Sequence, residues 1–339
     1  MIVVDILGAV WQRMKSLSII IAKELDRFKK RFFQENRSIN EIERLERLLN
    51  NQPYELYSKF LKNDQFLEIP RISKAEETLD YLLENKSSLC RFGDGEFTLM
   101  NGGSIHFQES DARLAKKLKL VLASNNENLL IALPDVFGDL DCYTEEVAEF
   151  WRKWLVKKRL KIYKEISMER KYYSAFFTRV YMPYKKNDKH EDRCSRYFSK
   201  IKNIWLDRDV IICEGVGTRF GLFNDFLNGA KSVSRVLCPP ENAFEKYNEI
   251  LDFCDSCSRE NLILLALGPT ATALSYDLHC KGFQAIDIGH LDIEYEWFLR
   301  KDTEGKPIEN KYVDGSKEGR QVSFIEDPVY KAQIVEKIL

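Results

Sequence analysis

Six short apolar runs alternate with helical patterns along the chain, and this alternation limits the possible folds more than any other feature of the sequence. The runs are SLCRF (88–92), NLLIALP (128–134), DVIICEG (209–215), SRVLCPP (234–240), NLILLALG (261–268) and QAIDIG (284–289). The segments between most of them carry apolar residues every three or four positions, which is typical of amphipathic helices. Strands that are apolar almost throughout are buried on both faces, as in a parallel sheet covered by helices. The sequence therefore predicts an α/β fold with a mostly parallel sheet and helices on both faces.

The expected helices lie between these strands and at the end of the chain. Their ranges are 73–86, 111–124, 144–166, 241–257, 271–281 and 324–339. Ser73 and Glu76 are spaced as a capping box at the start of the first helix. The stretch 301–323 is polar and contains glycine, so a mobile loop is expected there.

Residues 1–65 are predicted to form a helical N-terminal extension, and residues 66–339 a single catalytic domain. Residues 1–37 carry eight Lys and Arg against four Asp and Glu, which leaves a charge of +4. A basic amphipathic helix can lie on an anionic membrane, bind a second copy of the chain or pack on its own domain. The sequence favours packing within the protein or on a second copy, and leaves peripheral membrane contact through residues 1–50 open.

Charge and composition exclude several classes of protein. The 339 residues include 52 Lys and Arg and 53 Asp and Glu, and this balance argues against a general nucleic-acid binder. No apolar run reaches the roughly 18 residues of a membrane-spanning helix, and the first residues lack the pattern of a secretory signal. Several of the eight Cys lie in apolar runs, as expected of buried thiols in a reducing cytoplasm.

Polar and glycine residues follow each predicted strand, at the edge where open parallel sheets bind ligands. Asp94 and Glu96 come directly after the first strand, flanked by Gly93 and Gly95. In an extended backbone the two carboxylates share a face, and they repel each other unless a cation neutralises them. Mg²⁺ and Mn²⁺ take such oxygen ligands together with substrate phosphates. We therefore predict a divalent metal site at Asp94 and Glu96, with the guanidinium of Arg91 beside it as a phosphate ligand.

A second candidate for phosphate binding is the helix that begins in GPTATALSYDL (268–278). Pro269 suits the first turn of a helix, where free N–H groups can hold a phosphate, and Gly268 and Thr270 flank it. GVGTRFG (215–221) reads G-x-G-x-x-x-G, a near miss to the dinucleotide fingerprint, and the next strand lacks the expected acidic residue at its end. This motif keeps a NAD-dependent oxidoreductase as an alternative.

GHLDIEYEW (289–297) places four ionisable side chains at alternate positions. In extended geometry His290, Asp292, Glu294 and Glu296 share one face. A general base that deprotonates a hydroxyl is a candidate role for one of them. The alternative is an ordinary exposed strand or helix start.

Two further features are expected to be structural. The segment 151–171 carries nine Lys and Arg against two Glu, with aromatic residues between them. A solvated helix face with the aromatics packed inward is favoured over contact with an anionic acceptor or a membrane. Cys254 and Cys257 form a C-x-x-C pair, but no second pair follows at zinc spacing, so a structural role is favoured.

Together these motifs resemble those of the bacterial GT-D-fold glycosyltransferases, a family long described only as a domain of unknown function. The motifs are RFGDGE (91–96), EG-x-x-x-R-x-G-x-x-ND (214–225), LGPTATALSYDL (267–278) and QAIDIGHLDIEYEWF (284–298). The resemblance runs from about residue 70 to residue 339 and implies a Rossmann-like fold. Where the family usually reads E-G-x-x-S-R-x-G-V-G-N-D, this chain has Thr218 for Ser and Leu222-Phe223 for Val-Gly.

The resemblance implies a metal-dependent glycosyltransferase that moves a sugar from a nucleotide-sugar donor, typically a UDP-hexose, to a glycan, glycoprotein or lipid-linked acceptor in surface polysaccharide or adhesin glycosylation. Mn²⁺ or Mg²⁺ at Asp94 and Glu96 would bridge the donor diphosphate. The predicted donor contacts are Arg91, Glu214, Arg219, Asn224, Asp225, Gly268, Pro269 and Thr270. The base is predicted among Asp292, Glu294 and His290, with Asp292 or Glu294 favoured over His290. A cytoplasmic enzyme near the inner membrane leaflet follows from the resemblance, and a non-catalytic nucleotide- or glycan-binding module is the remaining alternative.

Overall fold

The structure, a computed structural model, describes residue 23 and residues 69–313, 319, 322 and 325–339. The chain divides into two compact units, Met1–Ile69 with Gly138–Lys161 and Pro70–Phe137 with Ile162–Leu339. Almost all of the predicted N-terminal extension, residues 1–65, lies outside the described residues, so its helical character and its contacts stay predictions.

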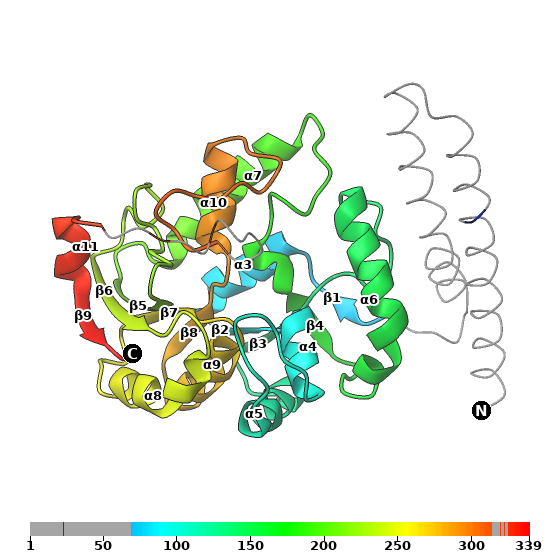
Figure 1. The fold of residues 1–339 in the computed structure, drawn as a ribbon, viewed down its shortest axis with the longest axis horizontal. Helices are drawn as coiled ribbons and strands as arrows, with labels where there is room; N and C mark the ends of the chain where they lie inside the picture. The colour runs from blue at the N-terminus through cyan, green and yellow to red at the C-terminus, as the bar shows by residue number, and fades with distance from the viewer. Residues whose placement is uncertain (1–22, 24–68, 314–318, 320–321, 323–324) are drawn as a thin grey trace. The chain divides into compact units, whose positions relative to one another are not determined.

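The larger unit is built on a parallel sheet of nine strands (Figure 1). The strands are β1 (Arg71–Ile72), β2 (Ser88–Arg91), β3 (Leu129–Leu133), β4 (Lys171–Ser174), β5 (Asp209–Gly215), β6 (Ser232–Cys238), β7 (Leu262–Ala266), β8 (Gln284–Asp287) and β9 (Ile334–Lys337). They lie in the order β1-β4-β3-β2-β8-β7-β5-β6-β9, and every pairing between neighbours is parallel. All six predicted strands form, so the predicted α/β fold is confirmed.

The three strands that the sequence did not predict lie at or next to the edges of the sheet. β1 has two residues, and three of the four residues of β9 are exposed. Neither strand carries the continuous apolar run that marks a strand buried on both faces. Only the pairing of β1 with β4 and of β9 with β6 identifies these two segments as strands.

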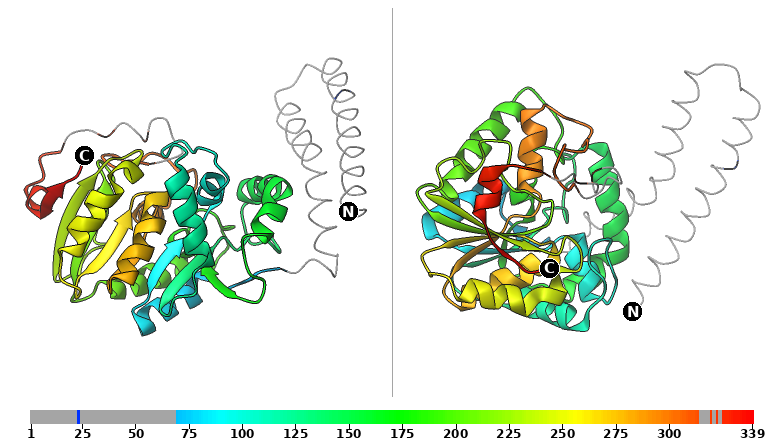
Figure 2. Two further views of the ribbon diagram at one scale, coloured as in Figure 1. Left: turned by 90° about the horizontal axis from the view of Figure 1, so that it is seen from below. Right: turned by 60° about the vertical axis from the view of Figure 1, so that its left-hand side comes forward.

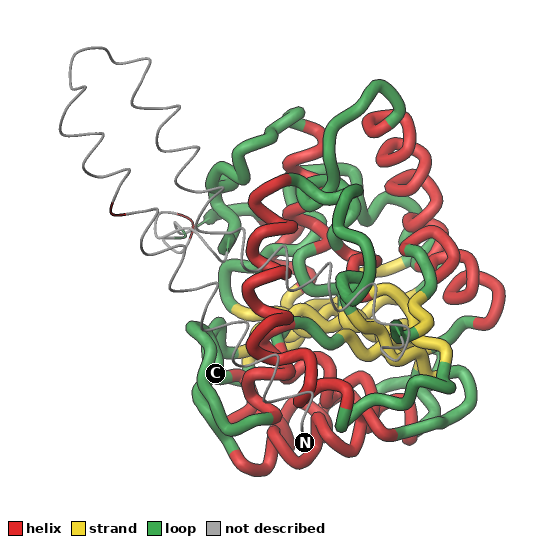
Figure 3. Tube along the Cα trace, turned by 90° about the vertical axis from the view of Figure 1, so that its right-hand side faces the viewer, coloured by secondary structure: helices red, strands yellow, loops and turns green. Residues whose placement is uncertain are grey.

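Helices cover both faces of the sheet (Figures 1, 2 and 3). α5, α8 and α9 pack together on one face, and α3, α7 and α10 lie on the other. Their bounds are α3 (Ala75–Asn85), α5 (Ala112–Ala123), α7 (His190–Ile201), α8 (Tyr247–Asp255), α9 (Pro269–Cys280) and α10 (Leu291–Leu299). The shorter helices are α4 (Asp94–Met100) and α11 (Pro328–Gln333), with 3-10 turns η1 (Ala175–Thr178), η2 (Lys202–Ile204) and η3 (Ala243–Lys246).

Two local predictions about helices are wrong. The residue before α3 is Lys74, not Ser73, and the buried Ser73 hydroxyl has no hydrogen-bond partner. Glu76 instead accepts a hydrogen bond from the Nε of Arg193 on α7, 2.7 Å away, so it links two helices and does not cap one. The segment 324–339 is not one helix, because the chain after α11 extends and pairs with β6.

Most of the described part of the smaller unit is one helix, α6 (Glu145–Tyr163). Trp151 and Leu155 are buried along one stripe of α6, whereas Lys157 and Lys161 are exposed. The rings of Trp151 and Trp154 meet edge to face with centroids 5.2 Å apart. The expected solvated basic face with inward-packed aromatics is therefore met only in part, because Arg159 is buried and Leu160 is exposed on the same helix. No helix in the described part of the chain is long and apolar enough to cross a membrane.

Two switch points lie at the carboxyl edge of the sheet. β2 leads through α4 and α5 to β3, whereas its other neighbour β8 leads through α10 to β9 at the far edge. β5 and β7 are also neighbours, and their connections leave in opposite directions, to β6 and to β8. Open α/β sheets bind ligands in the crevices at such strand ends. The residues after these four strands are therefore placed to bind a ligand.

A fully buried ion pair fixes the loop that follows β5. Glu214 and Arg235 expose at most 1% of their side chains, and Glu214 Oε1 lies 2.7 Å from Arg235 Nη1. The Phe220 N–H donates to Glu214 Oε2 at 2.7 Å, and Arg235 Nη2 donates to the Phe220 carbonyl at 2.9 Å. Burial raises the pKa of Glu214, and the charge of Arg235 acts in the opposite direction. The pair thus holds both backbone groups of Phe220.

We predict that Arg235→Met lowers the free energy of unfolding by about 3–5 kcal/mol, because it leaves the Glu214 carboxylate buried without its counter-charge. Urea unfolding measures the loss. Lys231→Met is the matched control, since it breaks the solvent-exposed Lys231–Asp209 pair at the opposite ends of the same two strands. Equal effects of the two substitutions would contradict the assigned role of the buried pair.

Candidate functional site

Arg91 and Asp287 join the carboxyl ends of β2 and β8. Arg91 Nη2 lies 2.9 Å from Asp287 Oδ1, and its Nε donates to the Oδ1 and to the carbonyl of the same residue, each at 3.1 Å. Its Nη1 donates to Thr178 Oγ1 at 2.6 Å and to the Ala175 carbonyl at 3.4 Å. A guanidinium has five N–H groups. Most of those of Arg91 are therefore engaged within the protein.

The Asp287 carboxylate receives further hydrogen bonds, from Thr272 Oγ1 at 3.2 Å and from the Gly289 N–H at 3.2 Å. Burial raises the pKa of Asp287, and the charge of Arg91 and these hydrogen bonds act against that shift. Sequence reasoning missed Asp287. The available signal was a charged residue at the end of an otherwise apolar strand.

Gly289 lies directly against Arg91. Its φ is +42°, and a Cβ at this position would lie 1.9 Å from Arg91 Nη2. No side chain fits there without displacing the guanidinium.

Asp94 and Glu96 lie in the first turn of α4, immediately after β2. The extended geometry predicted for them is wrong, because on a helix residues two apart point about 200° away from each other. Glu96 Oε2 accepts a hydrogen bond from the Gly93 N–H at 2.6 Å, and Asp94 is exposed. Burial, and after it the charge of Asp287, raises the pKa of Glu96 to about 7. The described residues contain no group of three or more His, Cys, Asp or Glu side chains that could hold a metal ion.

The extended geometry predicted for residues 290–296 is also wrong, because His290 precedes α10 and the other three side chains lie on that helix. Residues four apart on a helix lie on the same side. His290 and Glu294 therefore face one way, and Asp292 and Glu296 face another. The four groups form two separate pairs.

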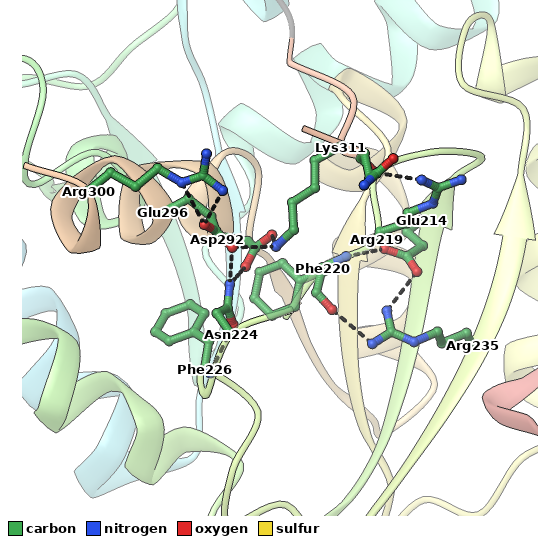
Figure 4. A network of polar contacts seen from close by, with 11 residues as sticks. Glu214, Arg219, Phe220, Asn224, Phe226, Arg235, Asp292, Glu296, Arg300 and Lys311 are labelled. Carbon is green, nitrogen blue, oxygen red and sulfur yellow. Dashed lines mark hydrogen bonds and ion pairs between the residues drawn. The ribbon is translucent and has the colours of Figure 1, made fainter. Parts of the chain in front are cut away.

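Asp292 and Glu296 are held in a buried cluster with Asn224 and Lys311, which we call the Lys311 cluster (Figure 4). Lys311 Nζ lies 2.6 Å from Asp292 Oδ2 and 3.0 Å from Glu296 Oε1. Asn224 Nδ2 donates to Asp292 Oδ1 at 2.9 Å and to Glu296 Oε1 at 2.7 Å. Sequence reasoning missed Lys311, which lies in the segment expected to be a polar loop and exposes 1% of its side chain.

Glu294 is fully buried on the other side of α10. Its Oε2 accepts hydrogen bonds from the Tyr181 N–H at 2.8 Å and the Met182 N–H at 3.0 Å, whereas its Oε1 has no hydrogen-bond partner. Burial raises the pKa of Glu294, and the charge of Arg179 opposes this. Burial and the charges of Arg179 and Arg91 lower the pKa of the half-buried His290, so its imidazole is neutral at pH 7. Arg179, a residue that sequence reasoning missed, acts on both members of this pair.

Residues after β5 were predicted to contact the donor. Both carboxylate oxygens of Glu214 have protein partners, so the geometry favours this contact least. Arg219 is nearly buried, has a φ of +51° and donates to the Asn310 carbonyl at 2.6 Å. Asp225 is more exposed and accepts hydrogen bonds from Lys202 Nζ at 2.7 Å and Tyr295 Oη at 2.6 Å, and these partners lower its pKa.

The start of α9 at Pro269 is as predicted. Gly268 has a φ of +54°, and a Cβ there would lie 2.5 Å from the Phe107 ring. Thr270 is buried, and its hydroxyl donates to Gln108 Oε1 at 3.4 Å. Phe107 and Gln108 therefore lie against this helix start.

We predict that Gly289→Ala destabilises the protein and weakens ligand binding at this edge, because the new methyl group displaces the Arg91 guanidinium. Gly282→Ala is the control, since Gly282 also has a positive φ, +89°, but no described atom lies within 4 Å of its Cβ position. Both substitutions carry the backbone strain of about 1–2 kcal/mol, so urea unfolding should show a larger loss for Gly289→Ala. Equal losses would show that the Arg91 contact is unimportant.

Comparison with known proteins places this site in a family. The family described as "Glycosyltransferase GT-D fold" matches residues 89–316. The chain is 38% identical over 266 residues to a probable glycosyl transferase Gly of Streptococcus gordonii, covering 78% of this chain and 38% of the relative. It is 35% identical over 274 residues to the glycosyltransferase GlyD of Streptococcus pneumoniae serotype 4 (strain ATCC BAA-334 / TIGR4), covering 80% and 33%. The matched part of the chain thus spans only 38% and 33% of the length of these two relatives.

Solved structures agree with this placement. The structure described as domain of unknown function 1792 with a distinct glycosyltransferase fold superposes with a TM-score of 0.75 at 35% identity, covering 84% of this chain and 99% of that one. A further glycosyltransferase with this domain, from Streptococcus sanguinis, gives a TM-score of 0.74 at 35% identity, covering 80% and 100%. The sheet, the strand-end motifs and these matches together show that the chain belongs to the glycosyltransferase GT-D fold family.

Proposed function

We propose that the chain is a glycosyltransferase that moves a hexose from a UDP-linked donor to a glycan, glycoprotein or lipid-linked acceptor, with Mn²⁺ or Mg²⁺ as cofactor. The observation that carries the proposal is the position of Asp94 and Glu96, directly after β2 at a switch point of the sheet. The two carboxylates follow Arg91 by three and five positions, and Arg91 is fixed by Asp287. The family relatives named as glycosyltransferases support the reaction class.

The donor set fits a hard divalent cation. Mg²⁺ and Mn²⁺ prefer oxygen ligands, and Mg²⁺ in particular is usually held by one or two carboxylates, with substrate phosphates and water completing the shell. Asp94 and Glu96 supply two carboxylates, but they point to different sides of α4, and Glu96 Oε2 accepts from the Gly93 N–H, so binding one cation through both requires the Glu96 side chain to turn away from Gly93. Such a cation supplies charge neutralisation for the UDP that leaves. The exposed Asp94 is the side chain that a donor reaches first.

The His290–Glu294 side of α10 is proposed to supply the base. Asp292 is the weaker candidate, because both of its oxygens are held by Lys311 and Asn224. His290 is half-buried, and burial and the charges of Arg179 and Arg91 lower the pKa of its imidazole, which makes it a weaker base than an ordinary histidine. Glu294 has one carboxylate oxygen without a hydrogen-bond partner.

The alternative as a NAD-dependent oxidoreductase is less favoured. The Gly217 carbonyl in the GVGTRFG loop accepts a hydrogen bond from the Tyr312 N–H at 2.8 Å. A Cβ at Gly217 would lie 3.0 Å from the Val322 side chain, so this glycine is already approached by protein. β6 ends at Cys238 and leads into Pro239, with no acidic residue for a ribose. A non-catalytic nucleotide- or glycan-binding module would bind its ligand without transferring a sugar, so a turnover assay distinguishes it from a glycosyltransferase. The predicted cytoplasmic location near the inner leaflet stays a prediction.

We predict that Asp94→Asn and Glu96→Gln each abolish Mn²⁺-dependent binding of UDP, because each removes an anionic ligand. Isothermal titration with UDP, with and without Mn²⁺, measures the effect. Glu109→Gln removes an exposed carboxylate that follows Glu96 by 13 positions, and this variant should bind UDP as the parent does. Parental binding by both site variants would refute the metal assignment.

We predict that His290→Gln or Glu294→Gln lowers kcat by about 10²–10⁴-fold, the usual contribution of a positioned base. UDP affinity, measured separately, should change little in the variant that removes the base. Asp292→Asn is the comparison on the same helix, and its main effect should be on stability. A loss of kcat confined to Asp292→Asn would place the base on the other side of α10.

A further inference from the structure

The segment that carries Lys311 lies along the loop that follows β5. The Tyr312 N–H donates to the Gly217 carbonyl at 2.8 Å, and Arg219 Nη1 donates to the Asn310 carbonyl at 2.6 Å. Residues on both sides of Lys311 are therefore hydrogen-bonded to the GVGTRFG loop. Figure 4 shows the side chains of Arg219 and Lys311 near each other, on the two segments that these hydrogen bonds join.

The side chain of Lys311 anchors the segment at one point. Its ammonium is buried between Asp292 Oδ2 and Glu296 Oε1, at 2.6 and 3.0 Å. Asn224 Nδ2 bonds to the same two carboxylates, and Arg300 lies 3.3 Å from the other oxygen of Glu296. The two carboxylates thus face two cations, so the buried charge is balanced.

A buried ion pair is a poor source of stability, because removing charges from water costs about as much as their attraction returns. Here the ion pairs of Lys311 fix the position of the segment that carries it. An ammonium held by two carboxylates fixes the position of the Lys311 backbone, and hence of the Asn310 carbonyl before it. That carbonyl is the partner of Arg219, a residue in a left-handed backbone conformation with 7% of its surface exposed.

We propose that Lys311 is a positioning residue for Arg219, and that it orients the Arg219 guanidinium toward the donor through the Asn310 carbonyl. The inference rests on the proposed function and on the contact between Arg219 and the nucleotide-sugar donor that the sequence predicts. A planar guanidinium recognises a phosphate through paired hydrogen bonds, which require a defined orientation. Losing the anchor should therefore weaken donor binding.

The test is a double-mutant cycle on the full chain with Lys311→Met and Arg219→Ala. The affinity for UDP with Mn²⁺ is measured by titration, and KM for the donor and kcat are measured with a UDP-sugar. Lys311→Met should raise the UDP Kd and the donor KM by about tenfold, with kcat changed far less. The double variant should bind UDP no more weakly than Arg219→Ala alone, so the roughly tenfold effect of Lys311→Met should disappear in the Arg219→Ala background, as for residues that act through one contact.

Two further variants keep the test decisive. Lys311→Met leaves two buried carboxylates without their ammonium, so the triple variant Asp292→Asn, Glu296→Gln, Lys311→Met removes all three charges and should fold while showing the same rise in KM. Lys117→Met breaks the partly buried Lys117–Asp277 pair between α5 and α9, and should leave the donor KM unchanged.

The outcomes separate the inference from the function on which it rests. If the parent binds UDP and the Lys311 and Arg219 effects multiply independently, or if Lys311→Met and the triple variant keep the parental KM, the positioning role is wrong and the proposed function stands. If the parent binds no nucleotide with or without Mn²⁺, the proposed function fails and the positioning role falls with it.

Discussion

The salt bridge between Arg91 and Asp287 is the interaction on which the rest of the site depends. β2 and β8 share one register pair, Leu89 with Ile286, whereas β5 and β6 share seven. The two halves of the sheet therefore meet at β2 and β8, where few backbone groups are paired. Side-chain contacts add to the junction between these two strands. At the amino end of the two strands, Ser88 Oγ donates to the Phe283 carbonyl and accepts from the Ala285 N–H. At the carboxyl end, Arg91 joins the strands through its salt bridge with Asp287.

This junction also explains why polar groups gather there. Asp287 sits in a buried strand end and needs a counter-charge, and the Arg91 guanidinium that provides it must fit against a glycine. Thr178 and Thr272 bring the turn after β4 and the helix after β7 to the same point. Asp94 and Glu96 follow Arg91 by three and five positions, so the position of the candidate metal ligands is set by the same salt bridge.

The sequence alone was sufficient to predict the strands and helices whose apolar residues follow a regular pattern. Six strands with continuous apolar runs and the helices between them were predicted, because a strand that is buried on both faces requires apolar side chains at nearly every position. β1, β4 and β9 were missed because short or half-exposed strands are defined by their neighbours. The strand-end positions of Arg91, Asp94 and Glu96 were predicted, but the local geometry of Asp94, Glu96 and the 290–296 segment was not. Alternating charges predict a strand face, and only tertiary structure shows that both segments are helical.

The contacts that sequence reasoning missed all join residues far apart in the chain. Asp287, Arg179 and Lys311 gain their roles from partners on other elements, and nothing in the local pattern around Lys311 marks it as buried. Glu214 shows the opposite case. A carboxylate at a strand end, just before a glycine-containing loop, resembles a ligand for sugar hydroxyls, but Arg235 and the Phe220 N–H bind its two oxygens, so the predicted donor contact is less favoured.

Diffraction from crystals grown with UDP and Mn²⁺, recorded where manganese scatters anomalously, tests the central claim most directly. The expected result is one strong anomalous peak within coordination distance of the Asp94 and Glu96 carboxylates, with the diphosphate oxygens of UDP bound to the same ion. A peak at another site, or UDP bound without an ion between it and these two carboxylates, would contradict the proposed metal-dependent glycosyl transfer at the Arg91–Asp287 junction.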